Sequence, residues 1–195
     1  SPVPIVTDEE MASMVAIMDK AAAATVATDG ARDYRGVLYG GFMLTPEGPK
    51  IVEFNVRFGD PECQVLMPLL ESDPLELMYD AACGNLDPSK VKIAGGFAAV
   101  VVMCARGYPG KYAKGDEISL PENVPANSQI VHAGTRREGD KILTAGGRVL
   151  GLSGFGKTLE EALANAYALA DSVKFDGGFF SRDIAHRELE RRAAK

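Results

Sequence analysis

The chain has 195 residues, of which 46% are hydrophobic, and it carries a formal net charge of −6 with a pI near 5.0. This length fits one large domain or two small ones with a sizeable core. The acidic balance argues against a general nucleic-acid-binding protein. The sequence shows no apolar run of about 18 residues and no leader pattern, so we expect neither a membrane span nor a signal peptide.

The three cysteines, Cys63, Cys83 and Cys104, lack CxxC spacing and are odd in number. They indicate free thiols in a reducing cytosol, so a cytoplasmic protein is expected. Only two histidines are present, which argues against a histidine-rich zinc site.

The first 29 residues predict an extended, proline-containing segment followed by a helix. Thr7 or Asp8 is expected to cap this helix, and Gly30 to end it. Its larger apolar residues recur at helical spacing and are expected to face a core: Met11, Met14, Val15 and Met18.

Two β-rich segments follow, at residues 36–45 and 50–58, and the turn residues 45–49 between them predict a hairpin. Gly40 and Gly41 interrupt the first strand and allow a bulge or a close approach of another group. The first strand supplies no carboxylate, so Glu53 on the second strand is the one acidic residue on either strand.

Beyond the hairpin, helices are predicted at residues 61–70 and 73–85. The pattern then changes to strands at residues 97–104, 129–133, 141–144 and 148–152, followed by a helix at 159–173 and a charged helical tail at 182–195. We therefore predict a domain over residues 1–88 and a second, β-rich domain over residues 89–195.

The strand within residues 51–62 (IVEFNVRFGDPE) carries the main candidate site. Alternation places Glu53, Asn55 and Arg57 on one face and an apolar, core-facing set on the other. A carboxylate and an amide oxygen suit Mg²⁺, which binds few protein oxygens together with substrate phosphates. An adjacent guanidinium steadies charge on a transferring group. The alternative is a solvated strand face without a ligand.

Asp60 and Pro61 follow this strand and predict the start of a helix, with Glu62 in its first turn. The polar face of the strand is therefore expected to lead directly into a group of charged residues.

Residues 53–62, together with YRGVLYGG at residues 34–41, resemble the phosphoribosylamine–glycine ligase (glycinamide ribonucleotide synthetase) family of ATP-grasp enzymes. Three later blocks are also similar to that family: GYPGKY at 107–112, HAGT at 132–135 and TAGGRVL at 144–150. The resemblance implies an α+β fold, with the C-terminal half of an ATP-grasp domain (antiparallel strands plus helices) followed by a small β-rich C-terminal domain.

The resemblance further implies ATP-dependent ligation of glycine to 5-phosphoribosylamine in purine biosynthesis, through a glycyl phosphate. Glu53 and Asn55 would hold Mg²⁺ or Mn²⁺ with ATP as co-substrate, and Arg57 and Asp60 would be catalytic. Weaker substrate or phosphate contacts would come from Glu62, Lys111 and Arg148.

The family's lid and nucleotide-binding lysines would lie upstream of Ser1. We therefore expect the 195 residues alone to bind ATP weakly, to be inactive, and to need the N-terminal and lid domains of the same enzyme as partners.

Two alternatives stay open. Residues 151–158 (GLSGFGKT) match the P-loop pattern, although the short helical sequence after them leaves no acidic strand for the metal, so Thr158 and Glu161 are expected to form a capping box. The chain could instead be a non-catalytic domain of a multifunctional purine enzyme. His132 is expected to be a half-buried histidine with its hydrogen bonds satisfied.

Overall fold

The computed structural model describes residues 1–2, 5–29 and 33–194, and the chain divides into two compact units. Unit 1 comprises Ser1–Pro2, Gln64–Leu69 and Ala94–Lys195, and unit 2 comprises Val3–Cys63 and Leu70–Ile93. Gly30, the predicted end of the first helix, lies outside the described residues.

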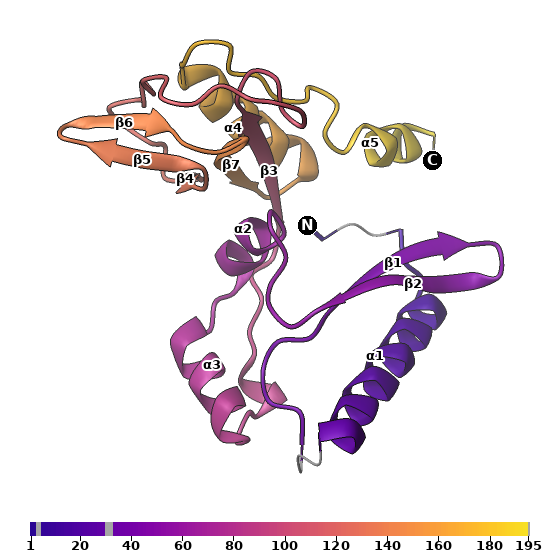
Figure 1. Ribbon diagram of the computed structural model, residues 1–195. Helices are drawn as coiled ribbons and strands as arrows, with labels where there is room; N and C mark the ends of the chain where they lie inside the picture. The colour runs from indigo at the N-terminus through magenta and orange to yellow at the C-terminus, as the bar shows by residue number, and fades with distance from the viewer. Residues whose placement is uncertain (3–4, 30–32, 195) are drawn as a thin grey trace. The chain divides into compact units, whose positions relative to one another are not determined.

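Unit 2 begins with α1 (Asp8–Asp29), which lies beside the hairpin of β1 (Tyr39–Thr45) and β2 (Gly48–Asn55) (Figure 1). A reciprocal capping box starts α1: the Glu10 amide donates to Thr7 Oγ1 over 3.2 Å, and the Thr7 amide donates to Glu10 Oε2 over 2.8 Å. The predicted cap at Thr7 is therefore confirmed. At the hairpin, Gly40 lets α1 approach β1, since a Cβ on Gly40 would lie 2.5 Å from Met18 Sδ.

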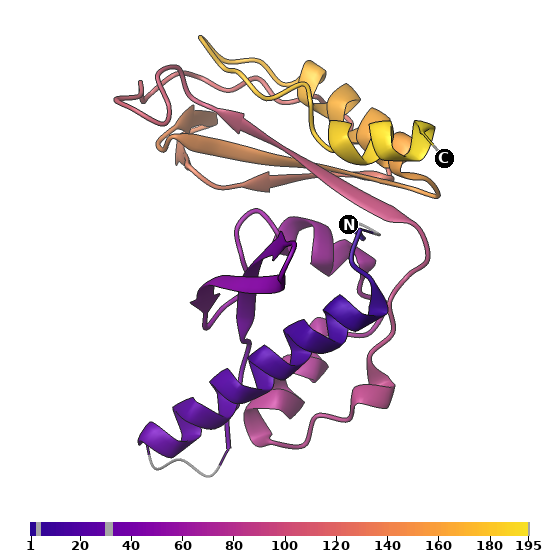
Figure 2. The same ribbon diagram turned by 90° about the vertical axis from the view of Figure 1, so that its right-hand side faces the viewer.

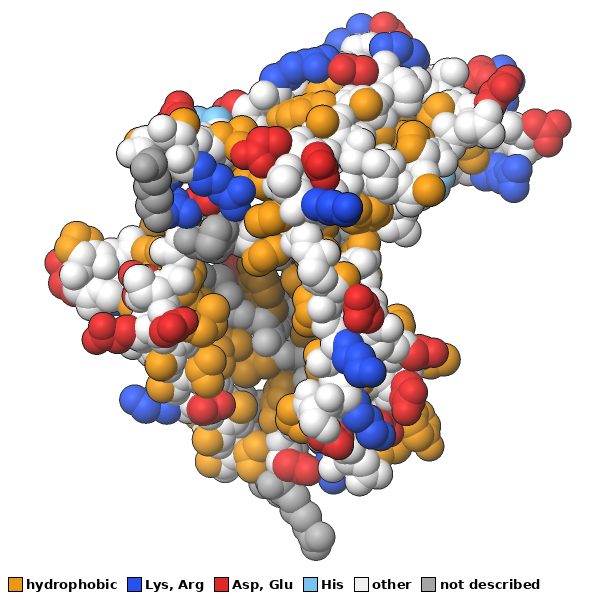
Figure 3. Space-filling view, turned by 180° about the vertical axis from the view of Figure 1, so that it is seen from behind, with side chains coloured by type: hydrophobic (Ala, Val, Ile, Leu, Met, Phe, Trp, Pro, Cys, Tyr) orange, Lys and Arg blue, Asp and Glu red, His pale blue; other side chains and the backbone are white. Residues whose placement is uncertain are grey.

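The apolar faces predicted for α1 and β2 are only partly buried, and here the sequence-based expectation was wrong. Met11 and Val15 on α1 are 51% and 50% exposed, and Val52 and Val56 around β2 are 67% and 75% exposed. The physical reason is that β1 and β2 form a two-stranded sheet, which offers α1 little surface to cover. Hydrophobic side chains accordingly reach the molecular surface in Figure 3.

The sequence predicts no membrane span, but α1 is long and apolar enough to match one. Its residues 8–28 reach a mean hydropathy of 1.2 over a length sufficient to cross a membrane, a match of length and composition only. Alanines supply much of this hydropathy, while Asp19 and Lys20 stand in the middle of the helix. Charges at that depth are costly in a bilayer, so the match is weak.

The antiparallel hairpin pairs Tyr39 with Asn55 and Gly41 with Glu53, and a bulge follows Gly41. The predicted turn closes it, with Gly48 at φ +98°. The bulge expected at the two glycines is confirmed. This register sets the polar residues of β2 opposite the first residues of β1.

The predicted helix at residues 61–70 is shorter than expected. The chain makes a turn through residues 60–62, then α2 (Cys63–Leu66) and a 3₁₀ turn η1 (Met67–Leu69). Asp60 therefore lies in the turn before α2, not at the position next to the first residue of the helix. The Cys63 amide bonds instead to the Gly59 carbonyl over 3.0 Å, which closes the turn ahead of the helix.

Unit 2 ends with α3 (Pro74–Cys83) and the 3₁₀ turn η2 (Pro88–Lys90). Asp73 caps α3 through the Leu75 and Glu76 amides, as predicted. At the other end Gly84 adopts φ +76°, and Arg35 Nη1 donates to the Cys83 carbonyl over 3.1 Å. This contact satisfies one of the carbonyls left open at the end of the helix.

Unit 1 is built on an antiparallel sheet in the order β3 (Phe97–Cys104), β7 (Arg148–Gly156), β4 (Ser128–His132). A separate hairpin pairs β5 (Thr135–Glu138) with β6 (Lys141–Thr144). The sequence did not predict β5, because Arg136 and Arg137 give it a polar pattern without alternation.

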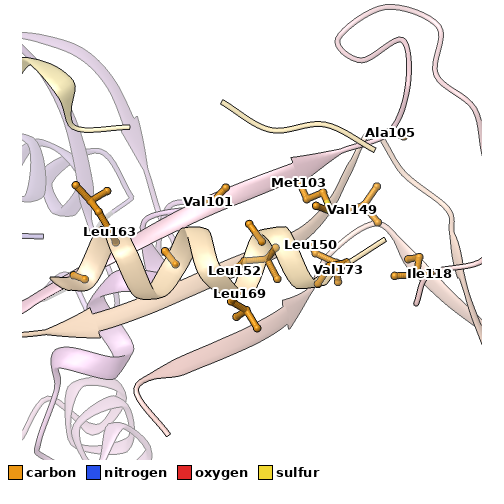
Figure 4. Close-up of a cluster of buried hydrophobic side chains, with 14 of the residues drawn as sticks. Val101, Met103, Ala105, Ile118, Val149, Leu150, Leu152, Leu163, Leu169 and Val173 are labelled. Carbon is orange, nitrogen blue, oxygen red and sulfur yellow. The ribbon is translucent and has the colours of Figure 1, made fainter. Parts of the chain in front are cut away.

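Helix α4 (Leu159–Ser172) covers one face of this sheet and forms the core with it. Figure 4 shows Leu163 and Leu169 of α4 in one cluster with Val101 of β3 and Leu150 and Leu152 of β7. These five side chains are between 0% and 5% exposed. Since alternate residues of β3 and β7 enter this layer, unit 1 has a core of its own.

Helix α5 (His186–Ala193) lies on the same side of the sheet as α4 (Figure 2). Its Glu188 is 5% exposed and accepts hydrogen bonds from Arg191 Nε over 2.7 Å and Arg192 Nε over 2.8 Å. These bonds lower the pKa of Glu188 to about 2. The charged tail thus contains a helix in which one buried carboxylate pairs with two partly exposed arginines.

Candidate functional site

Glu53 and Asn55 lie on the same face of β2, as their spacing predicts. Asn55 Nδ2 donates to Glu53 Oε1 over 3.2 Å, so the two side chains point toward one another. Among the described residues, none donates a hydrogen bond to Asn55 Oδ1. A side-chain amide and a carboxylate therefore stand together on an accessible strand face, with the amide nitrogen toward the carboxylate.

The strand opposite leaves room for this pair because it carries glycine. A Cβ on Gly41 would lie 3.0 Å from Glu53 Cγ, a tight contact. The missing side chain lets Glu53 lie across the hairpin toward β1, so Gly41 shapes the site without supplying a ligand.

Arg57 follows β2 and is exposed, with Nη1 donating to the Phe58 carbonyl over 3.1 Å. Asp60 is exposed in the turn before α2. Burial, with a smaller effect of the Asp60 carboxylate, raises the pKa of Cys63, which keeps that thiol protonated. Both side chains are exposed, and Arg57 and Asp60 remain candidate catalytic residues.

Glu62 is held in place by two neighbours. Tyr39 Oη donates to Glu62 Oε1 over 3.4 Å, from the strand position opposite Asn55. A Cβ on Gly59 would lie 2.1 Å from Glu62 Oε2 and 2.8 Å from its Cδ. The carboxylate therefore occupies the space that a side chain at residue 59 would need.

Tyr39 is the central residue of this group, and the sequence alone did not single it out. Burial raises its pKa most, the hydrogen-bonded Glu62 raises it further, and Glu53 adds a smaller effect. Arg57 lies near enough to lower the pKa of Tyr39 slightly. The structure thus gathers Glu53, Arg57 and Glu62 around one phenol, which only the register of the hairpin reveals.

The oxygens of Glu53 and Asn55 fit a divalent cation whose remaining coordination positions are filled by substrate and water. Among the residues that the structure describes, no three His, Cys, Asp or Glu side chains gather as a metal site. Glu53 and Asn55 alone offer two oxygens, which is the number that Mg²⁺ usually takes from protein when phosphates and water complete its octahedron.

The two remaining candidates, Lys111 and Arg148, belong to unit 1 and are exposed. They flank glycine turns that pack against each other. A Cβ on Gly147 would lie 2.3 Å from Tyr108 Cδ2, and one on Gly134 would lie 2.5 Å from the Arg148 carbonyl oxygen. The blocks 107–112, 132–135 and 144–150, far apart in sequence, therefore meet at one end of the sheet.

His132, in the second of these blocks, is exposed rather than half-buried as expected. Its Nδ1 lies 3.0 Å from Thr135 Oγ1. The difference arises because β4 is an edge strand, so the side chain at its last residue reaches solvent.

The P-loop alternative is contradicted by the conformation of residues 151–158. Residues 151–156 form the central strand β7, extended and hydrogen-bonded on both sides, rather than a phosphate-binding loop. A Cβ on Gly154 would lie 2.3 Å from the Ala166 amide nitrogen, so this glycine serves helix packing. Thr158 Oγ1 caps α4 by accepting from the Glu161 amide over 3.1 Å.

Comparisons with known proteins cover most of the chain. A family model described as "Phosphoribosylglycinamide synthetase, ATP-grasp (A) domain" matches residues 1–63, and one described as "Phosphoribosylglycinamide synthetase, C domain" matches residues 98–187. The phosphoribosylamine–glycine ligase of Agrobacterium fabrum is 39% identical over 194 residues, which span 100% of this chain and 46% of that protein.

A bifunctional purine biosynthetic protein of Pichia angusta is 46% identical over 157 residues, 80% of this chain and 20% of that protein. The crystal structure of phosphoribosylamine–glycine ligase from Thermotoga maritima superposes with a TM-score of 0.69 at 42% identity, over 77% of this chain and 37% of that one.

The chain thus spans about half the length of the curated ligase that it matches end to end. The mixed fold expected from the resemblance is confirmed, with part of an ATP-grasp domain followed by the C domain. The chain belongs to the phosphoribosylamine–glycine ligase family.

Proposed function

We propose that this chain forms part of an enzyme that joins glycine to 5-phosphoribosylamine at the expense of ATP, giving glycinamide ribonucleotide, ADP and phosphate. Family membership supports the reaction. The observation that carries the role of this chain is the pairing of Glu53 with Asn55 on one accessible strand face, beside Arg57.

In this reaction an oxygen of the glycine carboxylate attacks the γ-phosphorus of ATP and ADP leaves, which gives glycyl phosphate. The amine nitrogen of phosphoribosylamine then attacks the acyl carbon, phosphate leaves, and the nitrogen loses a proton to give the amide. The protein must therefore hold triphosphate and amino acid in line and neutralise charge as it develops.

Glu53 and Asn55 would hold Mg²⁺ or Mn²⁺ through one carboxylate and one amide oxygen. When bound, such an ion lowers the repulsion between the phosphates and an incoming carboxylate. Arg57 carries a permanent charge next to this pair and would steady the acyl phosphate or the oxyanion formed from it. Asp60, at the turn beyond, would contact the reacting groups.

Lys111 and Arg148 on unit 1 would bind a substrate phosphate, for which exposed cations beside tight glycine turns are suited. We further propose that residues 1–88 and 89–195 form separate domains and that the protein is cytoplasmic. Its partners would be the N-terminal and lid domains of the same ligase. The alternative proposal is a non-catalytic domain of a multifunctional purine enzyme, and the similarity to a bifunctional purine biosynthetic protein supports such a parent protein.

Steady-state assays on the complete polypeptide that carries this sequence would test the proposal. Phosphate release should require ATP, glycine and phosphoribosylamine together, and Glu53→Ala should abolish it without loss of folding. Full activity in that variant would overturn the proposal.

A further inference from the structure

We propose that Tyr39 and Gly59 position Glu62 so that its carboxylate receives the ammonium group of the amino-acid substrate. This inference rests on the proposed function and adds a specificity determinant to it. Glu62 is the residue argued to touch the substrate, and Tyr39 and Gly59 are positioning residues that act through it.

The first step is the fixed place of the carboxylate. Glu62 lies in a turn, where an unrestrained side chain would rotate freely, yet Tyr39 Oη donates to Oε1 over 3.4 Å. The other oxygen lies against the Cα of Gly59, where a Cβ would be only 2.1 Å away. Gly59 has no positive φ, so its backbone does not require glycine. The packing of Glu62 therefore explains the absence of a side chain at this position.

The second step is what a carboxylate held in this way can bind. A carboxylate accepts hydrogen bonds and does not donate them. The phenol uses one lone pair of one oxygen, so Glu62 has further lone pairs to offer. A group with several N–H donors and a positive charge fits it best, and a primary ammonium has three such donors.

The third step is the choice of substrate. Arg57 and Glu62 have opposite charges, and both lie near enough to Tyr39 to affect its hydroxyl electrostatically. A guanidinium matches a carboxylate and a carboxylate matches an ammonium, so the pair fits the two ends of a small zwitterion. Of the proposed substrates, glycine is the zwitterionic amino acid, and its carboxylate must lie by Arg57 to be activated.

The test uses the complete polypeptide with three single variants, Glu62→Gln, Tyr39→Phe and Gly59→Ala. Losing the charged acceptor should raise the KM for glycine about ten-fold or more, and each positioning variant should raise it about three- to ten-fold. The KM values for ATP and phosphoribosylamine should stay within about two-fold. Glycolate, which has a hydroxyl in place of the ammonium, should inhibit wild type and Glu62→Gln with the same Ki.

Two matched controls separate this role from general damage to the fold. Tyr34→Phe removes a hydroxyl that donates to the Val37 carbonyl over 3.0 Å, and Gly95→Ala adds a Cβ with nothing within 4 Å. Both should leave the KM for glycine unchanged.

Double variants then test whether the positioning residues act through Glu62. In the Glu62→Gln background, Tyr39→Phe and Gly59→Ala should add less than about two-fold to the KM for glycine. Full additive effects there, an unchanged KM for glycine in Glu62→Gln, or an effect on phosphoribosylamine instead would each overturn the inference. These outcomes leave the proposed function unaffected, because the Glu53→Ala variant tests that proposal separately.

Discussion

The side-chain amide of Asn55 donates to the carboxylate of Glu53 over 3.2 Å, two residues back along the same strand. The bond turns the Asn55 amide so that its donor side faces the carboxylate and its oxygen is left for another group. In the proposed cation site, Asn55 would supply one neutral oxygen and Glu53 one charged oxygen, and substrate phosphates would complete the coordination.

The first prediction concerns metal dependence. In the complete polypeptide, chelation should abolish ligation and added Mg²⁺ or Mn²⁺ should restore it. Glu53→Ala should lower kcat about 100-fold or more at any metal concentration, because no second carboxylate replaces Glu53. The control is Glu47→Ala, which removes an exposed carboxylate from the turn of the same hairpin and should retain full activity. Equal losses in the two variants would show that charge alone matters.

The second prediction concerns Lys157, the lysine of the P-loop pattern. The side chain is exposed at the residue before the cap of α4, where it has no phosphate-binding loop around it. Lys157→Ala should change kcat and the KM for ATP by less than about two-fold. A loss of nucleotide binding in this variant would restore the P-loop interpretation.

The third prediction concerns Gly154, beneath α4. An added Cβ would lie 2.3 Å from the Ala166 nitrogen and 2.4 Å from the Ala162 oxygen, and both are backbone atoms that cannot rotate away. Gly154→Ala should lower the free energy of unfolding of the 195-residue chain by about 1–3 kcal/mol, measured by denaturant titration. Gly95→Ala serves as the control with open space around it. Equal stability of the two variants would contradict the packing described for α4.

The fourth prediction concerns pH and Glu188. Its folded-state pKa of about 2 lies below its ordinary value of 4.5, so the ionised, paired form stabilises the folded state. The contribution is present above about pH 4.5 and is lost as pH falls toward 2. Glu188→Gln should lower the melting temperature at pH 7 and flatten its decline in that acidic window. An unchanged acid profile would show that the pair with Arg191 and Arg192 does not stabilise the fold.

Local sequence signals predicted the elements that depend on a few neighbouring residues. Asp73 before a proline gave the start of α3, and two glycines in β1 marked the bulge. Alternation along β2 also placed Glu53 and Asn55 together, since that period follows from strand geometry alone.

Features that depend on distant partners were not predictable in this way. Tyr39 acquires its role because the hairpin register sets it opposite Asn55 and the following turn brings Glu62 to its hydroxyl. The exposure of Val52 and Val56 likewise depends on how much surface covers β2, which their apolar character does not reveal. Asp60 lies in a turn that the hydrogen bond from the Cys63 amide to the Gly59 carbonyl closes, so the helix starts later than the sequence predicts.

The most direct test is a crystal structure of the complete polypeptide with Mn²⁺ and ADP, in which anomalous scattering locates the ion. The account predicts one Mn²⁺ with a Glu53 carboxylate oxygen and Asn55 Oδ1 both within about 2.3 Å, and nucleotide phosphate oxygens on its remaining positions. A nucleotide-bound ion that neither side chain touches, or the two oxygens turned to separate faces of β2, would contradict it.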